Sequence, residues 1–319
     1  MNSRADEGLD GARTHIGALS GRPVRIPAVD APPMPELTDD GVIHDGASIS
    51  WFGGIGTRDR GYPDALSFAR RFGLLIPATN TAMEHDLWSI IFRNQHAGGL
   101  RGAGLHTTPV RTPRPQVGTA EGLEEFKAQF LGGLEEATQM ALLAAPQYMI
   151  MGLSLEHILR GIDPIREQMQ VVETYCDLGW ATWHDAIAAA FAALGVQRIG
   201  ILTAWESRGN ASAVRMFEDL GVEVVTSAGF SCANVQHIAH VPDWAKEKAV
   251  LELLATPAHN LDAVVQCGTN MSMLDVTERL EPMIGIPVLG INAVTFWYAL
   301  RENGFLGPLE GGGRLLREH

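Results

Sequence analysis

The chain has 319 residues, 46% of them hydrophobic and 19% charged, and its formal net charge at pH 7 is −13. This composition is typical of a globular protein long enough for two lobes, and the negative charge argues against nucleic acid or an anionic membrane as a partner. No stretch reaches the roughly 20 apolar residues of a bilayer span, and the polar N-terminus lacks the apolar segment of a secretion signal.

Three cysteines, Cys176, Cys232 and Cys267, are too few and too scattered for a disulfide framework. They favour a reducing, cytoplasmic location. Residues 1–68 are rich in Pro, Gly and Asp, which predicts an extended N-terminal arm that is packed on the surface or partly disordered. Trp51 and Phe52 are its expected anchors.

Alternating strands and helices are predicted from residue 72 onward. In the first half, apolar runs predict strands at 72–78, 102–110, 146–153 and 170–175, and helical spacing predicts helices at 80–94 and 120–144. The second half repeats the scheme, with strands at 198–204, 222–227, 261–268 and 286–291 and helices at 210–221, 243–255, 272–285 and 293–304. Strands separated by helices of this length indicate an α/β fold with parallel sheets.

Ligands of such sheets bind at the carboxyl ends of the strands. The loops there read "PATNT", "GLSLEH", "TAWES" and "CGTNMS" and offer many uncharged donors: Thr79, Asn80, Thr81, Ser154, Thr203, Thr269 and Asn270. Such residues commonly cap helices, but helix N-termini also favour anions. A Thr-Asn pair at a strand end in each half favours a cradle for a carboxylate.

Neither a metal nor an organic cofactor is indicated. His237 and His240 are spaced i, i+3, but no carboxylate or cysteine stands at ligand spacing beside them. No phosphate-binding loop or strand-linked GxGxxG motif occurs, so no nucleotide cofactor is expected.

Four segments resemble the aspartate/glutamate racemase superfamily, in its branch of arylmalonate decarboxylase and maleate cis-trans isomerase. They are "LLIPATNTAMEHD", "MGLSLEHILRG", "IGILTAWES" and "GTNMSMLDVTERLEPMIGIPVLGINAVTFWYALR", and the resemblance runs from about Phe72 to Arg301 in the same element order. It implies two pseudo-symmetric lobes, each a short parallel sheet flanked by helices, with the active site in the cleft between them. The expected first lobe is 69–180 plus 290–319, and the second is 181–289.

The resemblance also implies cofactor-free chemistry through a carbanion or enediolate next to a carboxylate. Its racemases and isomerases use one cysteine from each lobe. Aligning "GTNMSMLD" with the family pattern "CTNLRTLD" puts Gly268, not Cys267, at the second cysteine position, and Gly152 falls at or near the first. Since successive strand residues point to opposite faces, a regular strand would turn Cys267 into the lobe, whereas a bulge would turn it to the cleft.

Other groups would then have to handle protons. Glu156 and His157 follow Gly152 closely, and a carboxyl at an apolar cleft can act as acid or base. Alternatively, Glu156 is a first-turn glutamate favoured by the helix dipole and His157 is a solvated helix residue. Trp205 stands where the family has a tyrosine, and it could stack on an unsaturated substrate or cover the cleft.

The leading hypothesis is a cofactor-independent lyase, decarboxylase-like, that acts on a small activated carboxylic acid. Its protonating acid would be Glu156 or Cys267. The second is an isomerase or racemase of a small (di)carboxylic acid, which "PATNTAME" favours and the missing cysteines weaken. The third is a carboxylate-binding protein without catalysis. The expected partner is the small carboxylic acid itself, and a homo-oligomer is a further expectation.

Overall fold

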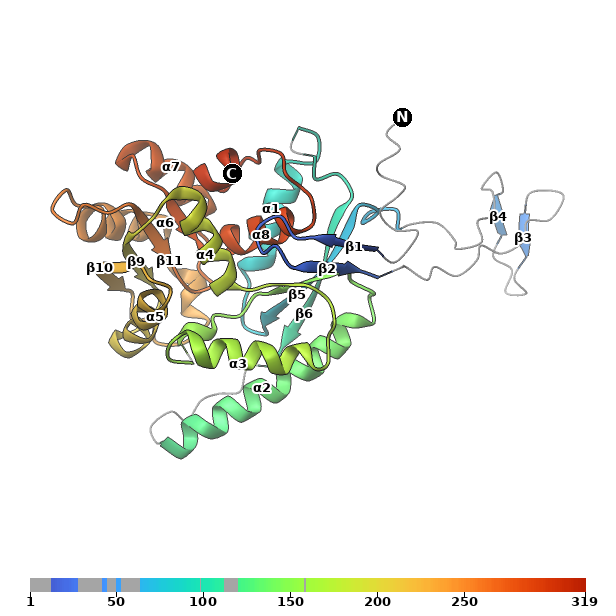
Figure 1. Cartoon of the computed structure of the whole chain (residues 1–319), viewed down its shortest axis with the longest axis horizontal. Coiled ribbons are helices and arrows are strands. Elements are labelled where there is room, and N and C mark those ends of the chain that lie inside the picture. Colours follow the sequence, from blue (N-terminus) through green and yellow to red (C-terminus); the bar gives the residue numbers. More distant parts are fainter. Residues whose placement is uncertain are drawn as a thin grey trace.

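Two four-stranded parallel sheets form the centre of the molecule, and helices cover them (Figure 1). This computed structural model describes residues 13–27, 42–44, 50–52, 64–97, 99–111, 120–157 and 159–319. Within these ranges no helix is both long and apolar enough to cross a bilayer.

The two sheets share one topology. The first consists of β5 (Arg70–Pro77), β6 (Ala103–Val110), β7 (Tyr148–Met151) and β8 (Trp180–Ala181). The second consists of β9 (Arg198–Thr203), β10 (Glu223–Gly229), β11 (Ala263–Gln266) and β12 (Val288–Gly290). Their orders are β6-β5-β7-β8 and β10-β9-β11-β12, so in each sheet the first strand in the chain lies between the second and third. The predicted α/β fold with two pseudo-symmetric lobes is confirmed, whereas the exact lobe boundaries stay a prediction.

Helices cover the faces of the sheets, which is why the central strands are mostly apolar. Every residue of β7 and of β11 is buried. The helices are α1 (Met83–Arg93), α2 (Ala120–Leu142), α3 (Ile162–Glu173), α4 (Trp183–Leu194), α5 (Ser207–Asp219), α6 (Asp243–Ala249), α7 (Leu274–Ile284), α8 (Ile291–Glu302) and α9 (Arg314–Glu318). A π-helical segment, Val250–Leu254, continues α6, and two 3₁₀ turns, η1 (Leu155–His157) and η2 (His237–His240), lie in loops.

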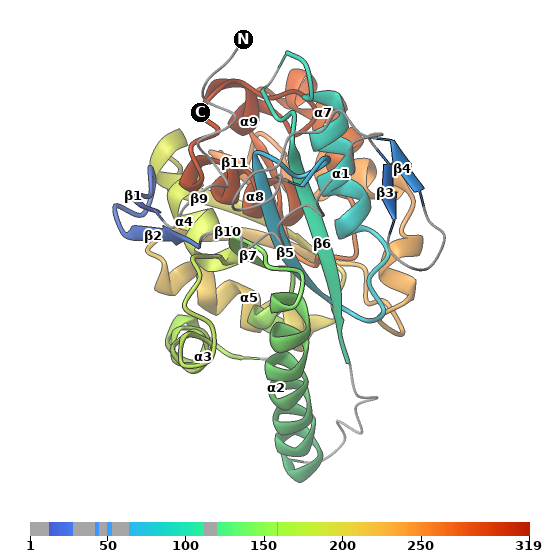
Figure 2. The ribbon, with the colours of Figure 1, turned by 90° about the vertical axis from the view of Figure 1, so that its right-hand side faces the viewer.

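Two helices join the lobes. Helix α8 follows β12 of the second sheet but packs on β7 and β8 of the first, and all of its residues are buried. Helix α4, which leads into the second lobe, packs against α8. Helix α5 of the second lobe also packs against η1 of the first. Figure 2 shows the lobes in contact, with α2 projecting beyond them.

One predicted strand was wrong, and several elements were not anticipated, α4 and β8 among them. Residues 170–175, predicted as a strand, lie mostly in α3 and the turn after it. The alternation there belongs to a helix whose buried positions, Ile162, Ile165, Met169 and Val172, recur every three or four residues. Helix α4 was missed because it is alanine-rich, and β8 because it has only two residues.

The N-terminal arm contributes to the core. Strands β1 (Arg13–Ile16) and β2 (Pro23–Ile26) pair antiparallel, and Val24 and Ile26 of β2 are buried. The turn is held by Glu302 of α8, whose carboxylate accepts hydrogen bonds from Leu19 N and Ser20 N at 2.7 and 2.9 Å. Strands β3 (Val42–His44) and β4 (Ser50–Phe52) also pair antiparallel. The side chains of the expected anchors in β4 lie outside the described part of the chain.

Replacing Ile26 by alanine tests whether the hairpin belongs to the core. Because the side chain is fully buried, Ile26→Ala should lower the free energy of unfolding by about 2–5 kcal/mol. The neighbouring Arg25 is exposed and pairs with Asp177 at the surface, so Arg25→Ala is the matched control and should change little. Urea unfolding measures both, and equal effects would contradict a docked hairpin.

Candidate active site

Four loops converge where the two sheets face each other. They follow β5, β7, β9 and β11 and span residues 78–82, 152–154, 204–206 and 267–273. In each sheet these loops leave the two strands between which the strand order reverses, the place where open α/β sheets bind ligands. The four loops singled out from the sequence are therefore those at the two switch points.

The two Thr-Asn loops hydrogen-bond directly to each other. Asn80 Nδ2 donates to Thr269 Oγ1 at 2.9 Å, and the backbone N–H of Thr81 donates to Asn270 Oδ1 at 2.8 Å. Asn270 Nδ2 in turn donates to the carbonyl of Thr79 at 3.2 Å. The structure thus brings the predicted cradle residues together, with their donors bonded across the junction between the lobes.

Both interpretations of Asn80, as helix cap and as cradle residue, have support in its contacts. Its Oδ1 accepts the backbone N–H groups of Ala82 and Met83, each at 3.0 Å, at the start of α1. Its Nδ2 donates to Thr269 of the second lobe. The amide therefore stabilises a helix end and presents a donor at the junction at the same time.

A buried carboxyl group that the sequence analysis missed supports this junction. Asp86 of α1 is fully buried, and it accepts hydrogen bonds from Ser272 Oγ at 2.7 Å and Asn292 Nδ2 at 2.8 Å. Burial raises the pKa of Asp86, and these hydrogen bonds act against that rise. Asn292 also donates to the carbonyl of Thr269 at 3.0 Å. The helical spacing of Asp86 from Met83 and Ile90 was the signal that it faces the interior.

The remaining predicted donors have different surroundings. Ser154 Oγ accepts the backbone N–H of Thr269 at 3.3 Å and so belongs to the junction. Thr203 is fully buried; it donates to Asn210 Oδ1 and accepts the backbone N–H of Trp205 at 3.0 Å. Thr203 therefore shapes the turn after β9.

The two glycines that the resemblance aligns at or near the family cysteine positions differ in the space around them. A Cβ on Gly152 would lie 2.5 Å from the carbonyl oxygen of Leu75 and 2.8 Å from Met83 Sδ, so no side chain fits. A Cβ on Gly268 would meet nothing closer than Ala204 Cβ at 3.8 Å, with the Trp205 ring at 4.0 Å. Gly268 has φ +106°, a conformation that strains other residues. A Cβ would therefore fit in ordinary van der Waals contact at Gly268 but not at Gly152.

Cys267 is fully buried and lies close to Trp183, in the first turn of α4. Burial raises the pKa of its thiol well above the usual range, and the charge of the nearby Glu156 acts in the same direction. The side chain is buried, as a regular strand end predicts. However, it faces the neighbourhood of Glu156, so the structure brings two candidate catalytic groups together.

Glu156 is the most perturbed carboxyl group of the site. It is 1% exposed, and Oε1 has no hydrogen-bond partner within the described residues. Burial raises its pKa from 4.5 to about 8. It therefore carries a proton at neutral pH. It borders a cavity of about 10 Å³ whose walls include Leu153, Trp183 and Met216, from both lobes.

Three histidines were further candidates, one for proton transfer and two for metal binding. His157 lies in η1 beside Glu156, but its side chain is outside the described part of the chain. His237 and His240 form the ends of η2, with ring centroids 6.0 Å apart. Among the described residues, no group of three or more His, Cys, Asp or Glu side chains is arranged to hold a metal ion.

Residues 129–316, more than half of the chain, match the protein family described as arylmalonate decarboxylase. The chain belongs to the arylmalonate decarboxylase family. A maleate isomerase from Nocardia farcinica (strain IFM 10152) is 24% identical over 254 residues, which cover 78% of this chain and 96% of that protein. These relatives are enzymes, which confirms the prediction of an enzyme at the level of the family.

Solved structures of this family's relatives have the same fold. A Nocardia farcinica maleate cis-trans isomerase variant with a covalently bound succinylcysteine intermediate has a TM-score of 0.66 and 21% identity, covering 78% of this chain and 99% of its own. A liganded double mutant of arylmalonate decarboxylase has a TM-score of 0.65 and 16% identity, covering 78% and 100%. The two-lobed architecture is thus shared with both enzymes.

Thiol labelling tests the environment of Cys267. A fully buried thiol with a raised pKa should react with iodoacetamide only when the protein unfolds. Cys232 is partly exposed and serves as the internal control that labels first. Mass spectrometry of peptides from the folded protein measures both. Fast labelling of Cys267 that a carboxylate ligand suppresses would contradict the buried position.

The raised pKa of Glu156 predicts a pH dependence of stability. Between pH 4.5 and about 8, folded Glu156 keeps a proton that the unfolded chain has released. The free energy of unfolding should therefore fall as pH rises through this window, by up to about 1.4 kcal/mol per pH unit from this group. Glu156→Gln should remove that contribution, whereas the exposed Glu167→Gln should not. Denaturant unfolding at several pH values measures the difference, and parallel curves for wild type and Glu156→Gln would exclude the raised pKa.

Proposed function

We propose that this protein is a cofactor-independent lyase that decarboxylates a small activated carboxylic acid, with Glu156 as the proton donor. The observation that carries the proposal is a fully buried carboxyl group near the carboxyl ends of the strands, whose Oε1 has no hydrogen-bond partner among the described residues. Burial raises its pKa to about 8. A general acid with a pKa near the working pH is well matched to proton transfer.

In the proposed reaction, the cradle residues Asn80, Thr269 and Asn270 exchange their mutual hydrogen bonds for bonds to one substrate carboxylate. The bond from the α-carbon to a second carboxylate breaks, CO₂ leaves, and the electron pair remains as an enediolate that the neutral donors stabilise. Glu156 then gives its proton to the α-carbon and takes another from solvent. Burial of the leaving carboxylate in apolar surroundings favours the loss of CO₂.

Trp205 and Gly268 would shape the substrate side of the site. The Trp205 ring lies 4.0 Å from where a Cβ on Gly268 would be, and Gly268 is the one of the two glycines where a Cβ would meet no clash. An indole there suits an unsaturated or aromatic substituent, which would also stabilise the enediolate. Ser154, bonded to the backbone of Thr269, would hold the cradle loop in position.

An isomerase of a small dicarboxylic acid is the second candidate, because the sequence relative covering most of the chain is a maleate isomerase. The related structure with a succinylcysteine intermediate involves a cysteine adduct in that protein. Here Gly152 leaves no room for a side chain, and the Cys267 thiol is buried and protonated. This chain would therefore have to isomerise its substrate by proton transfer through Glu156.

A screen of small mono- and dicarboxylic acids separates these reactions. Thermal shift identifies ligands, and proton NMR in D₂O then follows each one. Loss of CO₂ with one deuterium at the α-carbon supports the lyase. A cis–trans change or deuterium exchange without CO₂ loss supports the isomerase or racemase, and binding without turnover supports a non-catalytic protein.

With the substrate in hand, Glu156→Gln should fold normally and lose roughly a hundredfold or more in kcat, the usual scale for a general acid. The wild-type rate should fall as pH rises above about 8, because the carboxyl group then loses its proton. Glu167→Gln on the surface of α3 is the control. A Glu156→Gln enzyme with the wild-type rate would exclude Glu156 as the acid.

The cradle is tested by Asn80→Ala and Asn270→Ala. Losing one donor to a buried charged ligand should weaken binding by about 1.5–3 kcal/mol, about ten- to a hundredfold. Isothermal titration measures the affinity, and unfolding curves correct for the lost contacts between the lobes. The cradle is wrong if both variants bind the ligand as tightly as the wild type.

A further inference from the structure

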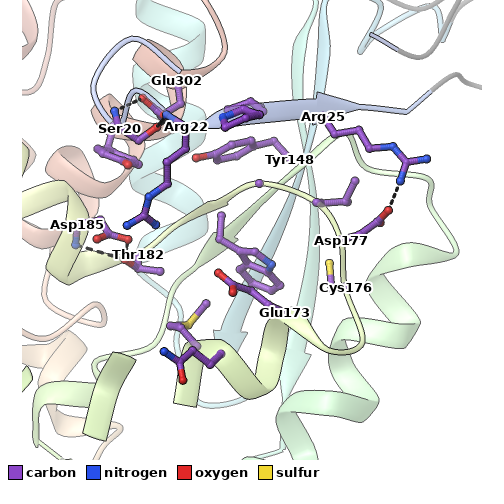
Figure 3. A pocket seen from close by; sticks show the side chains of 18 of the residues that line it. Ser20, Arg22, Arg25, Tyr148, Glu173, Cys176, Asp177, Thr182, Asp185 and Glu302 are labelled. Carbon is purple, nitrogen blue, oxygen red and sulfur yellow. Dashed lines mark hydrogen bonds and ion pairs between the residues drawn. The ribbon is translucent and has the colours of Figure 1, made fainter. Parts of the chain in front are cut away.

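A second, much larger pocket lies on the far side of the residues that enclose Glu156. It has a volume of about 490 Å³ and is lined by the hairpin β1–β2, α3, the end of β8 and α8 (Figure 3). Tyr148, Arg22 and Asp185 surround its interior in that view. None of the cradle residues borders it.

Two residues line both this pocket and the small cavity of Glu156. They are Thr182, which caps the N-terminus of α4, and His184, in its first turn. The small cavity has about the volume of one water molecule. Thr182 and His184 are therefore the polar groups that separate the sealed carboxyl group from an open pocket.

These two residues form a continuous polar chain. His184 Nε2 lies 3.4 Å from Thr182 Oγ1, and Thr182 Oγ1 donates to Asp185 Oδ2 at 2.8 Å. His184 is 6% exposed, whereas the Asp185 side chain is 36% exposed. The chain thus runs from the buried cavity to a half-exposed carboxylate at the pocket.

The electrostatic surroundings keep His184 uncharged at neutral pH. Burial lowers the pKa of its imidazole; Asp185 opposes this, and Arg166 and Arg22 add to it. A neutral imidazole has one nitrogen that accepts a proton and one that donates it. His184 can therefore pass a proton in either direction without holding a buried charge.

We propose that His184 and Thr182 are the proton path by which Glu156 is recharged from the 490 Å³ pocket, which no cradle residue borders. This inference rests on the proposed role of Glu156. After Glu156 has given its proton to substrate, its carboxylate takes one from His184 through one water molecule in the small cavity that both residues border. His184 takes a replacement from solvent in the pocket, so no net charge remains. The substrate side can then stay closed to water throughout the reaction.

The path is tested without a substrate, by hydrogen–deuterium exchange of the Glu156 carboxyl group. At about pH 6, below the pKa of Glu156, infrared spectroscopy should show a protonated carboxyl band that Glu156→Gln removes. After transfer to D₂O, the band should shift at least about tenfold more slowly in His184→Phe than in the wild type. His259→Phe, at the amino-terminal edge of the second sheet, should leave the rate unchanged.

Two further variants test the same path in case His184→Phe does not fold. His184→Gln fits the same space but cannot relay a proton, so it should slow exchange even if His184→Phe does not fold. In His184→Ala, added imidazole should restore fast exchange, because the pocket is large enough to admit it. Wild-type exchange rates in folded His184→Gln and His184→Ala, without imidazole, would overturn the path.

The outcomes also separate this inference from the proposed function. Absence of a Glu156-dependent band at low pH would overturn both. Fast exchange in the His184 variants, together with an inactive Glu156→Gln enzyme, overturns the path alone. A slow exchange in the His184 variants together with a fully active Glu156→Gln enzyme overturns the proposed function alone.

Discussion

The hydrogen bonds between residues 79–81 and 269–270 are the contacts on which the arrangement of the site depends. Each loop follows a buried strand of a different sheet, so the bonds fix the two switch points against each other. Asp86 of α1 stabilises the same junction by accepting hydrogen bonds from Ser272 and Asn292. Such hydrogen bonds are directional. A charged ligand could replace them, because each donor would exchange one hydrogen bond for another.

The apolar surroundings of the junction determine its chemistry. A carboxyl group placed among Leu153, Trp183 and Met216 cannot be solvated, so it keeps its proton at a pH where an exposed glutamate is charged. The same desolvation keeps the Cys267 thiol protonated and unreactive. One environment therefore raises the pKa of both groups.

Close packing at Gly152 excludes any side chain, cysteine included, by a different means. Gly152 donates its N–H to the carbonyl of Leu75 at 2.7 Å, and the approach of that strand and of Met83 leaves no space for a Cβ. The backbone there is part of the sheet packing. A Cβ on Gly268 would instead make only ordinary contacts, the nearest with Ala204 Cβ at 3.8 Å. The two lobes share a topology but not the same surroundings at their corresponding glycines.

The sequence by itself determined the fold class and the four loops of the site. Apolar runs separated by helical spacing specify parallel βαβ units, and in such units the loop after each strand lies at the carboxyl edge of the sheet, where ligands bind. Local patterns failed where an element was very short, as in β8, or lacked an amphipathic period, as in α4. The helical period of α3 was mistaken for a strand at 170–175 because six residues are too few to distinguish the two.

Only the tertiary structure decided which site residues meet and what their protonation states are. Glu156 and His157 are adjacent in the chain, yet the partners of Glu156 come from β7, α4 and α5, up to 60 residues away (Glu156 to Met216). Its pKa depends on the solvent that those elements exclude, and no sequence pattern reports exclusion of solvent. Likewise, Asn80 and Asn270 could be identified as strand-end donors, but their contact across the lobes depends on how two sheets dock. Docking is set by the summed packing of helices such as α8, which no local window contains.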